Sequence, residues 1–360
     1  MVNNYMKIAV TGDVHLTERK EHPERWDTFE NLLKDIQQKE INQLIIAGDL
    51  FNKDYDNYSK FDELTSKYAN IKFTIIPGNH DPKITQKAFT ADNIIVYSEP
   101  KIISLVDSRF HFLFIPYKPD VSMGKEITSY SYSLTSNEWI LIGHGDWADS
   151  IKTPNPIEPG IYMPLSRRDI NDYKPALTLL GHIHKPMDDS DYNVYYTGSP
   201  CGLDITETGR RRYLTLDTET LKIESINIDS EVIYFDETVV VYPMEEEKKY
   251  WENEIMDIKK KWDLTEEEKA KTEIRIKVIG YSSNKRKLEE FFDDEFEDYF
   301  FWKDEGVDVS EVSDSDNYEL LKISERVSEK IKEMDLEEKV GQPTRKKILS
   351  KAIQKIYSIS

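Results

Sequence analysis

The sequence predicts a layered α/β fold, with mixed sheets flanked by helices, followed by a small α+β cap and a C-terminal helix pair. Two observations in the first half predict the layers. Short apolar runs rich in β-branched residues recur, each ending in glycine and a polar residue, and an amphipathic stretch lies between the first two. Such runs are typical of strands buried on both faces, and strands alternating with helices are typical of layered α/β domains. The third observation is a shift to polar, helix-favouring segments after about residue 235.

The first half of the chain supplies the strands of the expected layers. Between the first two apolar runs, Arg25–Lys39 places Trp26, Phe29 and three aliphatic residues at helical spacing. Because ligands bind outside the carboxyl ends of strands in such folds, the polar residue after each run is a candidate site residue. The glycine beside it lets backbones approach closely at that edge. The runs lie at 7–12, 44–48, 72–78, 139–143 and 177–181, and further strand-like segments lie at 194–204 and 212–217.

The second half is more polar. Residues 289–319 carry 14 acidic side chains and one basic side chain, Lys303, and are expected to be largely a solvated linker. Two amphipathic helices are expected at the end of the chain, separated by the helix-breaking Gly341 and Pro343. The expected elements are a helical stretch at 244–271, a strand–helix–strand unit at 273–279, 284–292 and 299–303, and the two helices at 317–334 and 344–357.

Composition excludes several classes of protein. The 360 residues carry 48 basic and 68 acidic side chains, a net charge of −20, which argues against a free-standing nucleic-acid binder. The single cysteine excludes a disulfide framework and a cysteine-rich zinc module. No apolar stretch reaches the roughly 18 residues that span a bilayer, and no signal peptide is visible at the start. We therefore expect a cytoplasmic protein with no membrane partner.

Most of the histidines lie at the strand ends. Five of the seven occur in the motifs GDVH, GNHD, GHGD and GHIH, and Asp13, Asp49 and Asn79 accompany them at the strand ends. Imidazole suits zinc, manganese, iron or nickel, whereas an all-oxygen magnesium or calcium cage would not use four histidines. A structural zinc site would require cysteines. We interpret the other two histidines, His22 and His111, as loop and strand residues. The candidate site residues are Asp13, His15, Asp49, Asn79, His80, His144, His182 and His184.

The number of candidate ligands indicates two ions. Seven ligands are too many for one tetrahedral ion and fit two ions that share a carboxylate bridge. Two ions roughly 3.5–4 Å apart clamp a phosphoryl group, one activating water and the other stabilising charge. The sequence therefore predicts phosphoester hydrolysis.

The order GDVH, GDLFN, GNHD, GHGD and GHIH resembles the calcineurin-like metallophosphoesterase superfamily over roughly residues 6–205. Within it the chain is most similar to SbcD-type subunits of DNA double-strand-break nucleases, including phage recombination endonucleases. The segment GHIHKP, followed by YYTGSPCGLDITETGRRRYLTLD, carries that narrower similarity, as do the cap and the C-terminal helix pair. The resemblance implies a nuclease domain at 1–235, a DNA-binding cap at 236–310 and a partner-docking segment at 317–360.

The resemblance also implies roles for the site residues. Asp13, His15 and His184 would hold the first ion, and Asp49 would bridge the two. The second ion would be held by Asn79, His144 and His182. His80 matches the catalytic histidine of the family, which faces the scissile phosphate and is not a ligand.

The resemblance further implies two manganese ions, exonucleolytic and endonucleolytic cleavage of DNA, and an SMC-like coiled-coil ATPase (SbcC-type) as partner. It also suggests a homodimer. One position departs from the pattern, because Asn52 stands where some members carry a histidine implicated in handling duplex DNA. Duplex exonuclease activity is therefore less firmly implied than phosphodiester cleavage.

Two alternatives remain open. The chain could be a phosphoprotein phosphatase or small-molecule phosphodiesterase of the same superfamily, although Leu16 stands where phosphatases usually have glycine and GDLFNKD lacks their arginine. A nucleotide phosphodiesterase would not need the C-terminal helices. The chain could also be a non-catalytic scaffold for the ATPase, but no ligand of the set is missing.

Overall fold

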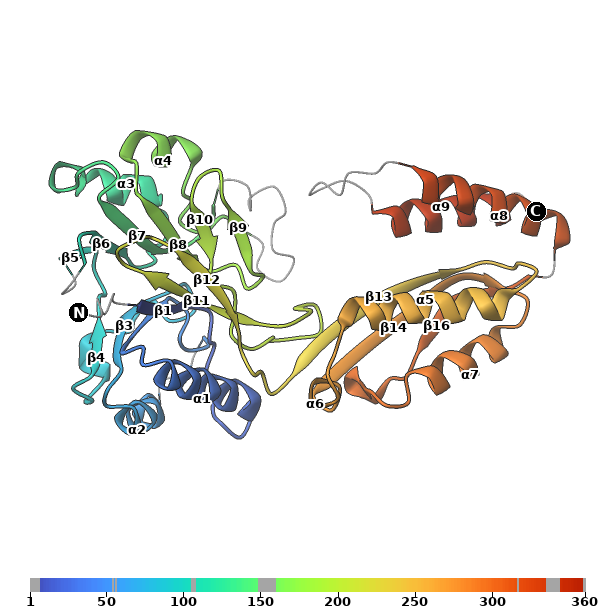
Figure 1. Ribbon diagram of the computed structural model, residues 1–360, viewed down its shortest axis with the longest axis horizontal. Coiled ribbons are helices and arrows are strands. Elements are labelled where there is room, and N and C mark those ends of the chain that lie inside the picture. Colours follow the sequence, from blue (N-terminus) through green and yellow to red (C-terminus); the bar gives the residue numbers. More distant parts are fainter. Residues whose placement is uncertain are drawn as a thin grey trace. The chain divides into compact units, whose positions relative to one another are not determined.

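A computed structural model describes residues 7–53, 55, 57–104, 108–147, 160–315, 317–334 and 344–358 (Figure 1). The chain folds into two compact units. The first comprises residues up to Leu203 and Arg210–Glu231, and the second comprises Asp204–Gly209 and the residues from Val232 onward.

Two six-stranded sheets form the centre of the first unit. In the first sheet β1 to β4 run parallel to one another, and in the second β6, β7, β8 and β10 do. The first has the order β12-β11-β1-β2-β3-β4: β12 (Ile223–Asn227), β11 (Arg212–Asp217), β1 (Lys7–Thr11), β2 (Gln43–Ala47), β3 (Lys72–Ile76) and β4 (Ile94–Val96). The second has the order β5-β6-β7-β8-β10-β9: β5 (Lys101–Ser104), β6 (His111–Ile115), β7 (Trp139–His144), β8 (Leu177–Gly181), β10 (Val194–Tyr196) and β9 (Met187–Asp189).

Side-chain alternation along these strands builds the layers. On β1, Ile8 and Val10 join a core shared with β7 and β8, whereas Ala9 joins the core beneath the helices of its own sheet. Both faces of the central strands are therefore buried, which explains their nearly continuous apolar sequence. Helices α1 (Pro23–Gln38) and α2 (Ser59–Lys67) lie outside the first sheet, and α3 (Met123–Thr128) and α4 (Arg167–Tyr173) lie outside the second (Figure 1). The predicted layered α/β fold is confirmed.

The second unit is a sheet with helices on both faces. The long strand β14 pairs in parallel with β13, β15 and β16, while α5 and α7 cover one face and α8 and α9 pack on the other (Figure 1). Its elements are β13 (Ile233–Val241), α5 (Glu247–Trp262), α6 (Glu266–Lys269), β14 (Thr272–Ser282), α7 (Lys285–Glu295), β15 (Phe300–Phe301), β16 (Asp308–Asp314), α8 (Tyr318–Glu333) and α9 (Arg345–Tyr357).

The acidic stretch 289–319 is not the linker that the sequence predicts. Its beginning is the second half of α7, and its end forms β16. In β16 the side chains of Val309 and Val312 are buried while Asp308 and Glu311 face solvent. The acidic residues of β16 therefore line the exposed face of the strand. The predicted strand 299–303 is also shorter, since only Phe300–Phe301 pair and a 3₁₀ turn follows.

The C-terminal helices are part of the second unit's core. Ile353 of α9 is fully buried, and the ring of Tyr357 stacks on Tyr281 of β14 with centroids 4.1 Å apart. On α8, Ile331 is buried while Ile323 is 48% exposed, and Met334, directly after the helix, is 49% exposed. Each helix thus buries one face on the sheet. The residues Gly341 and Pro343, predicted to break the helix, lie outside the described residues.

Candidate metal centre

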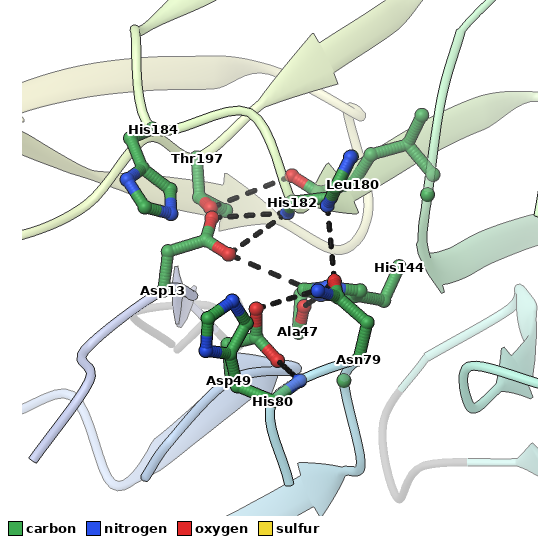
Figure 2. Close-up of polar contacts among 12 residues, drawn as sticks. Asp13, Ala47, Asp49, Asn79, His80, His144, Leu180, His182, His184 and Thr197 are labelled. Atoms are coloured by element: carbon green, nitrogen blue, oxygen red, sulfur yellow. Dashed lines mark hydrogen bonds and ion pairs between the residues drawn. The ribbon is translucent and has the colours of Figure 1, made fainter. Parts of the chain in front are cut away.

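Five strands deliver the candidate site residues to one edge of the two sheets. Asp13 and His15 follow β1, Asp49 follows β2, and Asn79 and His80 follow β3. From the other sheet, His144 ends β7, and His182 and His184 follow β8. Because these strands are parallel within each sheet, their carboxyl ends meet, and the labelled side chains in Figure 2 converge from both sheets. The structure thus brings all eight predicted residues together.

Glycines allow the two sheets to approach at this edge. A Cβ at Gly181 would lie 2.0 Å from the carbonyl oxygen of Ala47, and a Cβ at Gly48 would lie 2.1 Å from Nδ1 of His144. Gly48 also has a φ of +91°, in the region that favours glycine. Gly181 therefore serves the close backbone approach that the sequence predicts, and Gly48 leaves room for the ring of His144.

Asp13, His15 and His184 form one half of the site. Their ligand atoms all lie within 4.8 Å of one another. Nε2 of His15 is 3.1 Å from Nε2 of His184 and 3.7 Å from Oδ2 of Asp49. Two imidazole nitrogens that face each other can share at most one proton, whereas a cation between such groups would be bound by both lone pairs. This donor set fits a divalent ion.

Asn79, His144 and His182 form the other half. Oδ1 of Asn79 lies 2.8 Å from Nε2 of His144 and 3.0 Å from Nδ1 of His182 (Figure 2). Nδ1 of His144 donates to the carbonyl oxygen of Ala47 at 2.8 Å, which directs Nε2 into the site. Oδ2 of Asp49 lies 3.3 Å from Nε2 of His144. The same Asp49 oxygen thus faces both halves, as a bridging carboxylate requires.

His80 lies beside Asp49. Its backbone N–H donates to Oδ1 of Asp49 at 2.8 Å, and its ring packs edge-on against His15 with centroids 4.6 Å apart. A ring nitrogen of His80 also lies within 4.8 Å of the ligand atoms of His15 and Asp49. Its role as a catalytic residue that does not bind metal therefore stays a prediction.

Burial and charge shift the protonation of the centre. Burial raises the pKa of Asp13 to about 6 and lowers the pKa of His15 to about 3. At Asp49 and His144 burial acts against the charged forms, but their mutual attraction outweighs it. The pKa of Asp49 is held well below its usual range, and the pKa of His144 rises to about 10. Without metal, these two groups form a buried ion pair, and a bound cation would take the place of the His144 proton.

Two further carboxylates support the centre and were not predicted as site residues. Asp81 accepts hydrogen bonds from the backbone N–H of Gly78 at 2.7 Å and of Phe51 at 3.0 Å, so it ties two ligand loops together. Asp146 accepts from the N–H of Tyr162 at 2.7 Å and lies 3.6 Å from Nε2 of His182. Both stand two residues after a candidate ligand in GNHD and GHGD, which is the signal that could have identified them.

Residues 6–210 match the family model described as calcineurin-like phosphoesterase. The chain belongs to the calcineurin-like phosphoesterase family. A search of curated proteins gave no match. One solved crystal structure is 16% identical to this chain in sequence, with a TM-score of 0.43. The match covers 62% of this chain and 100% of the chain in that structure. The crystal structure of TT1561 of Thermus thermophilus is 14% identical with a TM-score of 0.39, and covers 62% of this chain and 99% of its own.

This calcineurin-like phosphoesterase is thus a hydrolase of a family that depends on two metal ions, and its Asp and His clusters can bind metal. Within the part of the chain that the structure describes, no helix has the length and apolar character needed to cross a membrane.

Proposed function

We propose that this calcineurin-like phosphoesterase is the manganese-dependent nuclease subunit of a DNA repair or recombination complex. The hydrolytic part of the proposal rests on one observation, which is that the carboxylate of Asp49 faces both halves of the centre. Two bound divalent ions would supply an activated water and stabilise charge on the phosphate. The DNA part rests on the similarity of 181–186 and 195–217 to SbcD-type nucleases and on the second unit that follows the phosphoesterase domain.

The chain's own residues would bind and orient the groups that react. The first ion is assigned to Asp13, His15 and His184, and the second to Asn79, His144 and His182. His80 is half-buried beside Asp49 and is held by its backbone hydrogen bond to that carboxylate. Its imidazole would donate a proton to the leaving oxygen or stabilise charge on the phosphorus centre.

We propose that the partner is an SMC-like coiled-coil ATPase that binds the C-terminal helices. Ile323 on α8 and Met334 directly after it are large apolar side chains that stay about half exposed after the helix has packed on its sheet. Exposed apolar side chains on a helix can contact the helix of a partner. Ile323→Asp should abolish co-purification with the ATPase. Glu329→Lys, an exposed change about a third of a turn away from Ile323 around the same helix, is the control that should not.

A nuclease assay tests the main proposal. The full chain is loaded with Mn²⁺ and incubated with labelled single-stranded and duplex DNA, with and without the ATPase and ATP. Cleavage of DNA that Asp49→Ala abolishes would support the proposal. Hydrolysis of bis(p-nitrophenyl) phosphate without DNA cleavage under any of these conditions would favour a small-molecule phosphodiesterase. Partner binding with no hydrolysis of either substrate would favour a scaffold.

A further inference from the structure

Two buried arginines lie behind one half of the metal centre. Arg25, in the first turn of α1, is 6% exposed, and Arg211, immediately before β11, is 1% exposed. A buried guanidinium costs several kcal/mol unless its donors are satisfied, so the partners of these side chains indicate what they stabilise.

Both arginines donate to the backbone of a candidate ligand. Nη1 of Arg25 donates to the carbonyl oxygen of His15 at 3.0 Å. Nη2 of Arg211 donates to the carbonyl oxygen of His184, which also accepts from the N–H of Ser199 at 3.0 Å. Nε of Arg211 donates to the carbonyl oxygen of Ser199 at 2.9 Å, which fixes the direction of the guanidinium. Each arginine thus holds one member of the His15–His184 pair.

The backbone at His15 needs such support. His15 has a φ of 49° and Asp13 a φ of 53°, both in the left-handed region, which costs roughly 1–2 kcal/mol per non-glycine residue. The rings of His15 and His184 lie only 4.8 Å apart between centroids. A strained loop tends to relax unless its backbone is held, and movement of either backbone would change the spacing of the two facing imidazoles.

We propose that Arg25 and Arg211 are positioning residues that preorganise His15 and His184 to bind one of the two ions. The other half of the centre has a different anchor, because the ring of His144 donates directly to the carbonyl oxygen of Ala47. Loss of either arginine should therefore weaken the binding of one ion and leave the binding of the other unchanged.

The charge of an arginine and its hydrogen bonds have opposite effects on metal binding, so the two effects can be distinguished. A guanidinium near a cation repels it, so removal of the charge alone would strengthen metal binding. Loss of the hydrogen bonds to the ligand backbone would weaken it. Arg→Lys keeps the charge but loses the planar fork of donors, whereas Arg→Met loses both. Weaker binding in both variants is expected only if the arginines position the ligands.

The test is a calorimetric titration of the metal-free full chain with Mn²⁺. Arg211→Met, Arg211→Lys and Arg25→Lys should each lower the affinity of one site by about 10–100-fold, the usual effect of losing a residue that orients a ligand. Arg212→Met is the matched control. Arg212 is 8% exposed and donates to Asp188 and to the carbonyl oxygen of Tyr196. Its loss should leave both affinities unchanged.

Thermal unfolding of the metal-free variants shows whether a loss of metal affinity is merely the result of a loss of stability. Arg211→Met and Arg212→Met should both lower the melting temperature, but only the former should alter metal binding. If Arg211→Met does not fold, the two lysine variants decide the question. In a His184→Ala background one site remains, and adding Arg211→Met should not weaken it further. Equal weakening of both sites, tighter binding by Arg211→Met, or the same metal defect in Arg212→Met would overturn the proposal.

Discussion

Asp49 is the residue that both halves of the metal centre share. One of its oxygens lies 3.3 Å from Nε2 of His144 and 3.7 Å from Nε2 of His15. Without this carboxylate, two cations would face each other with no shared anion. We therefore expect Asp49→Ala to lose both metals and to lower kcat/KM by more than ~100-fold, since even residues that only orient a ligand can cost 10–100-fold. Metal analysis by mass spectrometry measures the loss.

The control for this change is Asp172→Ala, which removes an exposed carboxylate paired with Arg168 and should leave two ions bound. One ion retained at full occupancy in Asp49→Ala would show that Asp49 is a terminal ligand of a single ion.

A substitution at His80 tests whether this single residue acts in catalysis or in metal binding. We expect His80→Gln to reduce kcat by about 10²–10⁴-fold, the range for loss of a general acid or base, while two manganese ions stay bound. His22→Gln is the matched control, because His22 lies half-exposed before α1 and pairs with Glu24. Turnover of a simple phosphodiester and manganese content are measured on the same samples. A parallel loss of manganese would instead indicate that His80 is a ligand.

At the scale of elements, local signals in the sequence determine what could be predicted. The strands before Asp13, Asp49, Asn79 and His182 are apolar runs closed by glycine, so both the strand and the residue at its end are visible in the sequence. In β16 a register shift interrupts the pairing with β14, so Val309 and Val312 do not alternate regularly among the acidic residues. The excess of acidic residues there predicts a linker, and the irregular spacing of the two valines gives no strand signal against it. Likewise, no sequence signal shows which arginines are buried.

The C-terminal helices offer a test of how elements pack. Ile353 of α9 is fully buried against the sheet of the second unit, whereas Ile323 of α8 is 48% exposed. We expect Ile353→Ala to destabilise that unit by about 2–4 kcal/mol, because it removes buried methyl groups and leaves a cavity. Ile323→Ala should change the free energy of unfolding by less than ~0.5 kcal/mol. Urea denaturation measures both. Equal effects would mean that α9 does not pack as described.

At the scale of the whole molecule, charge governs the encounter with DNA. The chain has a net charge of −20, so its long-range field repels a polyanion. Two exposed arginines are already paired with carboxylates, because Arg19 contacts Asp27 and Arg168 lies 3.3 Å from Asp172. Tight DNA binding should therefore need help from bound metal or from a basic partner.

The metal-free chain should therefore bind DNA weakly. We expect a Kd no tighter than ~10⁻⁴–10⁻⁶ M at physiological salt, the range of non-specific binding, with a steep fall in affinity as salt rises. Mn²⁺ should strengthen binding, because bound cations reverse the local charge at the centre. Fluorescence anisotropy of a labelled oligonucleotide measures both effects, and His80→Gln serves as the metal-loaded form that cleaves slowly. Nanomolar, salt-insensitive binding by the metal-free chain would show that a basic surface elsewhere on the molecule, and not the metal centre, holds the DNA.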